Sequence, residues 1–189
     1  MLFRRSCLVC RRDGPALCVS CRRGLAPPPV TRVRGVGRVP AAFAYDGTGA
    51  RVIQALKFRD GRRLVGPVAD LVAPLVPPDA ESVTWLPTSG ARRRERGFDQ
   101  AELLARAVAR RCDLPVVRLL ARRPGAAQTG RSRDEREGNA CFVARGSLAG
   151  PVVAVDDVCT TGATARAALG ALRPVTTDRV TLVVAARTP

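Results

Sequence analysis

The chain has 189 residues, of which 46% are hydrophobic and 25% charged, and its 32 basic and 16 acidic side chains give a net charge of +16. This length fits one domain of ordinary size with a small appendage, and the hydrophobic content suffices for a core. The absence of histidine excludes a Ser-His-Asp or Cys-His nucleophile and any imidazole metal ligand. The sequence contains no run of 18 apolar residues, and its N-terminus lacks the apolar stretch of a signal peptide. We therefore expect a cytoplasmic protein with reduced thiols and no membrane insertion.

Four cysteines near the N-terminus, Cys7, Cys10, Cys18 and Cys21, follow the pattern Cys-x2-Cys-x7-Cys-x2-Cys. Two such pairs can give four thiolates to one tetrahedral ion, and a closed shell of four thiolates is structural rather than catalytic. Two disulfides or four free thiols are the alternatives; the expected cytoplasmic location argues against the first, and the paired spacing argues against the second. We predict a structural Zn²⁺ site in a module that spans residues 1–26, where bound metal replaces the missing apolar core.

A stretch rich in Pro, Gly and Arg, residues 27–38, is predicted to link this module to a main domain of residues 39–189. The elements expected in that domain are strands at 39–45, 82–86, 116–120, 152–155 and 180–185, and helices at 49–58, 64–76, 99–111 and 164–172. Strands that alternate with helices indicate an α/β fold with a central parallel sheet flanked by helices.

Residues 152–164 carry the most specific pattern. The Val-rich run 152–155 is typical of a strand buried in a parallel sheet, and Asp156 and Asp157 follow at its carboxyl end, where such sheets bind ligands. Two carboxylates can accept hydrogen bonds from the two hydroxyls of a ribose diol. A small loop then supplies backbone N–H groups, hydroxyls and a helix N-terminus, which suit a phosphate, at Thr160, Thr161, Gly162, Ala163 and Thr164. The alternative is a buried strand that ends in a solvated acidic turn.

Two further polar segments follow predicted strands. Small residues at Pro87, Thr88 and Ser89 precede an arginine cluster that includes Arg93, and guanidinium groups match the oxygens of a diphosphate. A solvated, basic helix entrance is the alternative. Residues 121–139 are too polar to pack and long for a static connector, although a plain surface loop remains the alternative.

The segment 152–164 resembles the signature of type I phosphoribosyltransferases, which bind 5-phosphoribosyl diphosphate (PRPP) with Mg²⁺. The resemblance implies that Asp156 and Asp157 hold the ribose hydroxyls and that residues 160–164 hold the 5′-phosphate. It also implies that the loop at Pro87–Ser89, with Arg93, binds the pyrophosphate. In that family a mobile loop closes over the substrate at the position of residues 121–139, so Arg133 or Arg136 would bring positive charge to the departing pyrophosphate.

The order of motifs along nearly the whole chain resembles the ComF family of competence-associated proteins. Its parts are the four-cysteine module, Leu56-Lys57-Phe58, the segment from Pro87 through Arg96-Gly97-Phe98-Asp99-Gln100, and residues 152–164. The resemblance implies a type I phosphoribosyltransferase-like sheet with a small N-terminal zinc finger. It further implies phosphoribosyl transfer to an unknown, nucleobase-like acceptor and a role in DNA uptake or nucleotide metabolism.

A non-catalytic function is the main alternative to phosphoribosyl transfer. The chain would then be a PRPP sensor or a competence protein that binds single-stranded DNA or the DNA-uptake machinery. Residues 1–40 contain nine Arg and one Asp, which is half of the net charge, and a basic surface of this kind favours an anionic partner.

Overall fold

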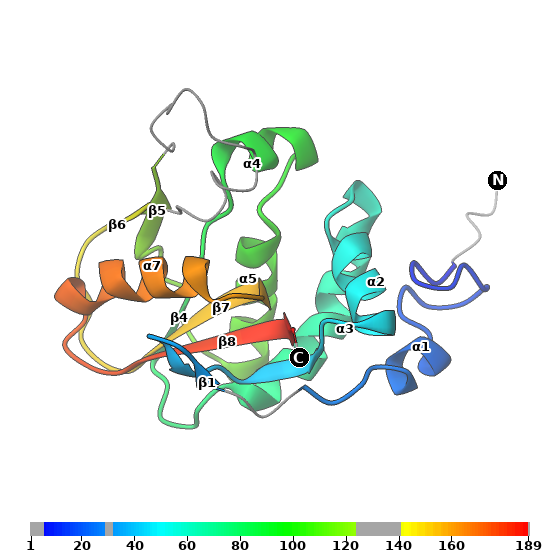
Figure 1. Ribbon diagram of the computed structural model, residues 1–189, viewed down its shortest axis with the longest axis horizontal. Helices are drawn as coiled ribbons and strands as arrows, with labels where there is room; N and C mark the ends of the chain where they lie inside the picture. The colour runs from blue at the N-terminus through cyan, green and yellow to red at the C-terminus, as the bar shows by residue number, and fades with distance from the viewer. Residues whose placement is uncertain (1–5, 29–31, 124–140, 189) are drawn as a thin grey trace.

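A four-stranded parallel sheet lies at the centre of the computed structural model, which describes residues 6–28, 32–123 and 141–188 (Figure 1). The strands run in the order β3 (Ala41–Ala44), β8 (Val180–Arg187), β7 (Val152–Cys159) and β4 (Ser82–Trp85). Helices cover both faces of this sheet (Figure 1). The predicted fold class is confirmed: a central parallel sheet flanked by helices, with a small four-cysteine module at the N-terminus.

Strand β7 is apolar throughout its first half because both of its sides face a core. Val153 and Val155 belong to one buried cluster, whereas Val152 and Ala154 belong to another on the opposite face of the sheet. A strand with helices on both sides needs a continuous apolar run rather than alternation, which is why residues 152–155 could be recognised from the sequence.

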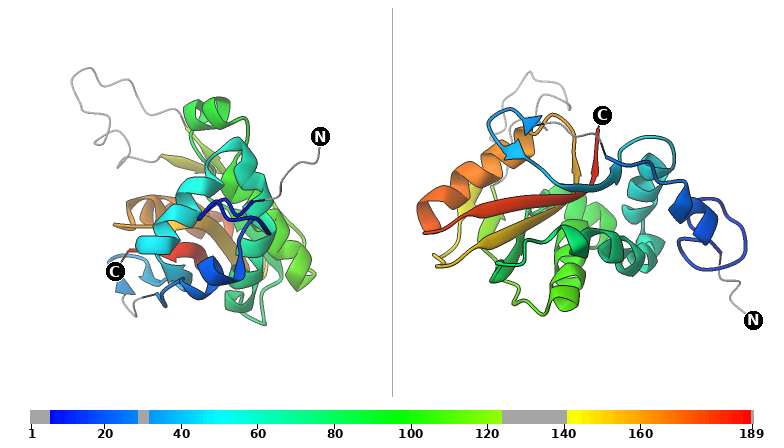
Figure 2. Two further views of the ribbon diagram at one scale, coloured as in Figure 1. Left: turned by 90° about the vertical axis from the view of Figure 1, so that its right-hand side faces the viewer. Right: turned by 90° about the horizontal axis from the view of Figure 1, so that it is seen from below.

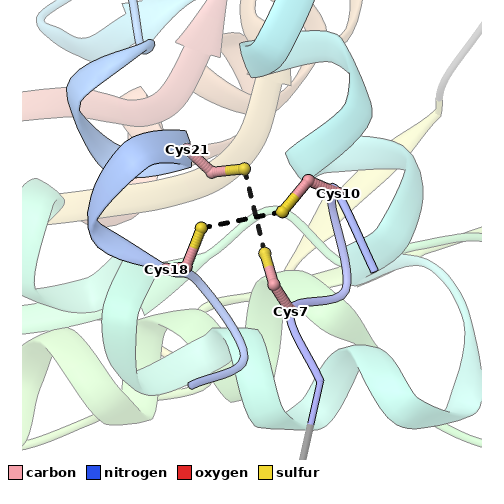
Figure 3. A group of neighbouring side chains, drawn as sticks. All are labelled: Cys7, Cys10, Cys18 and Cys21. Atoms are coloured by element: carbon pink, nitrogen blue, oxygen red, sulfur yellow. Dashed lines mark hydrogen bonds between the residues drawn. The ribbon is translucent and has the colours of Figure 1, made fainter. Parts of the chain in front are cut away.

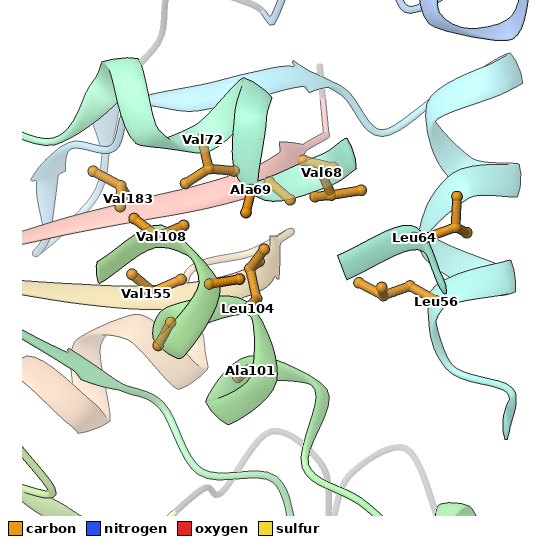
Figure 4. Close-up of a cluster of buried hydrophobic side chains, with 14 of the residues drawn as sticks. Leu56, Leu64, Val68, Ala69, Val72, Ala101, Leu104, Val108, Val155 and Val183 are labelled. Carbon is orange, nitrogen blue, oxygen red and sulfur yellow. The ribbon is translucent and has the colours of Figure 1, made fainter. Parts of the chain in front are cut away.

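One face of the sheet is covered by α2 (Gly47–Leu56), α3 (Arg62–Val72) and α5 (Gln100–Cys112), with the short 3₁₀ turns η1 (Arg59–Gly61) and η2 (Ala73–Leu75) between them. Figure 4 shows side chains of α3 and α5, among them Val68 and Leu104, packed toward the strands, where Val155 of β7 lies. All three are fully buried, and the helices lie within a few residues of the predicted bounds.

The other face carries α7 (Ala163–Leu172), the 3₁₀ turn η3 (Arg173–Val175) and a two-stranded antiparallel sheet of β5 (Leu120–Arg122) and β6 (Phe142–Ala144). The predicted core strand at 116–120 is wrong. Only Val116 bridges Val83 of β4, and the regular strand starts at Leu120 and pairs with β6 instead. Pro115 accepts a hydrogen bond from Val83 but has no N–H to donate, so pairing beside β4 stays short.

Helix α4 (Gly90–Arg96) was not expected from the sequence, where the arginine cluster was interpreted as part of a loop. Ser89 caps it by accepting a hydrogen bond from the Arg92 N–H, and Gly97 ends it in the left-handed conformation at φ +78°. Asp99 then caps α5, which begins within one residue of the predicted start.

The N-terminal module contains α1 (Val19–Arg23) and lies beside α2 and α3, on the side of the domain away from α7 (Figures 1 and 2). Its buried residues Cys7, Leu17 and Cys21 join the core cluster of α3 and α5. Within the predicted linker 27–38, a hairpin forms from β1 (Arg32–Val33) and β2 (Gly37–Arg38). Among the described helices, none has the length and apolar character needed to cross a membrane.

Candidate functional site

A cavity of about 450 Å³ lies at the carboxyl ends of β4 and β7. Because these strands are parallel neighbours, the loops that follow them meet at one edge of the sheet, where α/β proteins bind ligands. The cavity brings together eight residues that the sequence singled out: Pro87, Thr88, Asp156, Asp157, Thr160, Thr161, Ala163 and Thr164. Gly162, also predicted, lines a smaller adjoining cavity of about 40 Å³ that shares several of these residues.

Asp156 and Asp157 both line the cavity although they are neighbours on one strand. The Asp157 backbone N–H donates to Asp156 Oδ1 at 2.8 Å, and Gln100 Nε2 donates to Asp157 Oδ2 at 3.1 Å. Asp157 is only 6% exposed. Both acids therefore occupy fixed positions beside the same space.

Burial raises the pKa of the Asp156 carboxyl well above its usual range, and the charge of Asp157 raises it further. Asp99 adds a smaller contribution in the same direction, whereas the Asp157 backbone N–H opposes it. The two acids therefore repel each other. A ligand that donates hydrogen bonds or brings positive charge would relieve this repulsion.

The loop at 160–164 leads into the N-terminus of α7, which has no side-chain cap. Gly162 adopts φ +74°, and a Cβ added there would lie 2.1 Å from Val33 Cγ1 of the β1–β2 hairpin. Arg166 Nη1 donates both to Arg34 O at 3.0 Å and to Thr161 O at 3.1 Å. The hairpin thus packs directly on this loop, and the uncapped helix end beside it is suited to a phosphate.

The loop at 87–90 is fixed by Asp99. Its Oδ2 accepts from the Thr88 backbone N–H at 3.0 Å, and its Oδ1 accepts from the N–H groups of Ala101 and Glu102 at 3.1 and 3.3 Å. Burial raises the pKa of this carboxyl, although the three N–H groups oppose the shift. One buried side chain therefore connects the Thr88 loop to the start of α5.

The predicted arginines occupy different places. Arg93 is exposed and does not line the cavity, whereas Arg92 does. Helix α4 explains the difference, because successive residues of a helix point about 100° apart. Ser89 caps α4 instead of lining the cavity. Arg133 and Arg136 lie outside the described residues, as does most of the segment predicted to be a mobile loop.

Four further lining residues were not among the predicted site residues: Tyr45, Lys57, Gln100 and Arg122. Lys57 is the only lysine of the chain, and this feature could have indicated it as a candidate site residue. Gln100, like Lys57, belongs to a segment that carries the resemblance to the ComF family, but no role at the site was predicted for it. Tyr45 and Arg122 were not predicted as site residues, because their place depends on how β3 and β5 meet the sheet edge.

The four cysteines of the N-terminal module converge as predicted, with all Sγ atoms within 4.8 Å of one another (Figure 3). The Sγ atoms lie 3.8 Å apart for Cys7 and Cys21, and 3.7 Å for Cys10 and Cys18. Four sulfurs bonded at about 2.3 Å to one tetrahedral ion lie about 3.8 Å apart. Burial raises the pKa of Cys7, but backbone N–H groups of Cys18, Cys10 and Val9 outweigh it and lower that pKa to about 6. Burial and the neighbouring thiols raise the pKa of Cys21 to about 12, because four thiolates this close repel one another unless a cation lies between them. The cluster fits a metal ion.

No protein-family model matches the chain, and no curated protein matches it. Among solved structures it is similar to an allosteric regulatory enzyme of purine biosynthesis, at 20% identity and TM-score 0.48 over 65% of this chain and 25% of that one. It is also similar to adenine phosphoribosyltransferase from Leishmania tarentolae, at 13% identity and TM-score 0.40 over 65% of this chain and 70% of that one. A third similar structure is adenine phosphoribosyltransferase from Trypanosoma brucei in complex with AMP, pyrophosphate and ribose-5-phosphate, at 15% identity and TM-score 0.39 over 88% and 79%.

The raised pKa of Asp156 predicts a stability change. The pKa of the Asp156 carboxyl is higher in the folded chain than in the unfolded chain, where it is about 3.9. The free energy of unfolding therefore falls as the pH rises from about 3.9 through the pKa of the folded state. Asp156→Asn should therefore raise the free energy of unfolding at pH 7 by about 0.5–2 kcal/mol and by much less at pH 4. Urea unfolding at both pH values measures this.

Asp60→Asn, at an exposed position, is the control and should change stability by less than about 0.5 kcal/mol. An Asp156→Asn variant that is less stable than the wild type at pH 7 would contradict the electrostatic description of the acid pair.

Proposed function

We propose that the cavity binds PRPP and that the protein is a phosphoribosyltransferase. The observation that carries the proposal is that two neighbouring carboxylates, of which Asp157 is buried, line one cavity together with the N-terminus of α7, whose cap residue Gly162 has no side chain. Asp156 and Asp157 would accept hydrogen bonds from the ribose hydroxyls, and the loop at 160–164 would hold the 5-phosphate. A sugar phosphate carries these two groups at opposite ends, so the cavity fits both.

The pyrophosphate would lie between the Thr88 loop and the cations that line the cavity, Lys57 and Arg92. Mg²⁺ bound to the diphosphate would neutralise part of its charge. In the transfer, the acceptor forms a bond to ribose C1 while the bond from C1 to pyrophosphate breaks. The transition state has oxocarbenium character, so the protein acts by holding groups in place and stabilising charge. Arg133 and Arg136 are proposed to approach the pyrophosphate from the segment between β5 and β6.

The acceptor is proposed to be nucleobase-like, and the protein is proposed to be a cytoplasmic member of the ComF type with a role in DNA uptake or nucleotide metabolism. The order of motifs along the sequence supports this proposal, as does the four-cysteine module packed against the domain that carries the cavity.

Zinc is the metal that we propose for the cysteine cluster. Four thiolates in tetrahedral array are the ligand set of structural zinc, and the closed shell leaves no position for a substrate. The exposed arginines Arg11, Arg12, Arg22 and Arg23 surround the cluster and would offset the negative charge of zinc with four thiolates.

Replacing both acids tests the PRPP site. Asp156→Asn/Asp157→Asn should weaken the binding of Mg²⁺-PRPP at least about 100-fold, because two charged acceptors for hydroxyl groups are lost. Calorimetric titration measures binding, and pyrophosphate release in the presence of nucleobases measures transfer. Asp60→Asn should bind as the wild type does. Absence of PRPP binding by the zinc-loaded wild type would overturn the proposal, whereas binding without release would favour a PRPP sensor.

Metal analysis tests the zinc site. The wild type should contain one zinc per chain, and Cys10→Ser should lose it, because metal binding supplies on the order of 10 kcal/mol to modules of this kind. Cys112→Ser, at a half-buried cysteine outside the cluster, should retain full zinc content. Far less than one zinc per wild-type chain would refute the assignment.

Single-stranded DNA binding is a second candidate function, which we propose because the module carries four exposed arginines and an exposed apolar side chain, Val19, which is 62% exposed. Arg22→Ala/Arg23→Ala should weaken binding and lower the slope of log K against log salt concentration by about 1.4, or about 0.7 for each lost phosphate contact. Arg110→Ala, an exposed arginine of α5, is the control. Binding that does not depend on salt would exclude this function.

A further inference from the structure

Gln100 has a polar atom that no described residue satisfies. The side chain is 5% exposed and lines the main cavity beside Asp156 and Asp157. Its Nε2 donates to Asp157 Oδ2 at 3.1 Å, but its Oε1 is buried and has no hydrogen-bond partner within the described part of the chain. Buried acceptors without a donor are rare in native proteins, and each such atom calls for an explanation.

The orientation of this amide is determined by its neighbour. An ionised carboxylate only accepts hydrogen bonds, so the NH₂ group must face Asp157 and the oxygen must face away from it. The backbone is fixed as well, because Gln100 is the first residue of α5, directly after the Asp99 cap. Rotation of the amide by 180° would place two oxygens against each other. Oε1 is therefore held as an acceptor.

The chemistry of the missing partner follows from this geometry. An acceptor needs a hydroxyl or N–H donor, and an ionised phosphate has none to offer. The space beside Gln100 also contains two acids, and burial together with the charge of Asp157 raises the pKa of Asp156. A neutral amide oxygen adds a hydrogen-bond acceptor there without adding a third negative charge.

We propose that Gln100 Oε1 accepts a hydrogen bond from a ring hydroxyl of the bound ribose and so makes the site specific for ribose over deoxyribose phosphates. This inference rests on the proposed function, because it assumes that a sugar phosphate occupies the cavity. Gln100 then has two roles: its NH₂ group positions Asp157, and its oxygen contacts the sugar.

The two roles are separated by a cycle that changes the ligand and the protein. Ribose 5-phosphate, 2-deoxyribose 5-phosphate and 3-deoxyribose 5-phosphate are titrated calorimetrically into the wild type and into Gln100→Met, which has a similar volume but no acceptor. The wild type should bind ribose 5-phosphate about 5- to 150-fold more tightly than the deoxy sugar that lacks the relevant hydroxyl. In Gln100→Met that ratio should fall by most of this factor.

A purely positioning role gives a different result. A positioning role acts through Asp157, so it has no further effect once Asp157 is replaced. If Gln100 only holds Asp157, then Asp157→Asn and Asp157→Asn/Gln100→Met give equal ratios between the three ligands, and the inference is overturned. Failure of the wild type to bind any of the three sugar phosphates would overturn the proposed function itself. Gln54→Met, at an exposed position of α2, is the matched control and should leave all affinities unchanged.

A second variant covers the case in which Gln100→Met does not fold. Gln100→Asn keeps an amide but withdraws it by one methylene, and it should also reduce the discrimination between ribose and deoxyribose phosphates. Circular dichroism and urea unfolding establish the folded state of each variant before titration. Unchanged discrimination in a folded Asn variant counts against the inference in the same way as in the Met variant.

Discussion

Two neighbouring carboxylates at the end of a strand buried on both faces repel each other and lose hydration, and the structure around Asp156 and Asp157 compensates for this in several ways. The Asp157 N–H and the Gln100 amide donate to the pair, while burial keeps the pKa of Asp156 raised. Compensation is incomplete within the described part of the chain, where no residue donates to Gln100 Oε1. An arrangement of this kind is destabilising without a ligand, as is typical of binding sites.

Asp99 connects the acid pair to the rest of the cavity. Its carboxylate holds the Thr88 loop on one side and the first turn of α5 on the other, and α5 begins with the glutamine that contacts Asp157. The loop proposed for pyrophosphate and the acids proposed for ribose are therefore linked through one buried side chain. On the opposite side, the β1–β2 hairpin contacts Gly162, so the segment next to the cysteine module restrains the loop proposed for phosphate.

The sequence was sufficient to predict the sheet strands β3, β4, β7 and β8, because their apolar runs reflect burial, and the cysteine cluster, because its spacing reflects shared coordination. It did not predict α4, whose seven residues are stabilised by a Ser89 cap and a left-handed Gly97 rather than by an apolar face. That helix determines which arginine faces the cavity. The sequence analysis therefore predicted Arg93 as the site residue, whereas Arg92 lines the cavity. No site role was predicted for Gln100, which was named only within a segment that resembles the ComF family, or for Arg122, because their place at the site depends on tertiary contacts.

A structure with bound ribose 5-phosphate tests the central claim most directly. The account predicts the ring hydroxyls within hydrogen-bond distance of the Asp156 and Asp157 carboxylates and of Gln100 Oε1, with the 5-phosphate on the N–H groups at the start of α7. A sugar phosphate bound in the reverse orientation, with its phosphate at the Thr88 loop and its hydroxyls away from both acids, would contradict it.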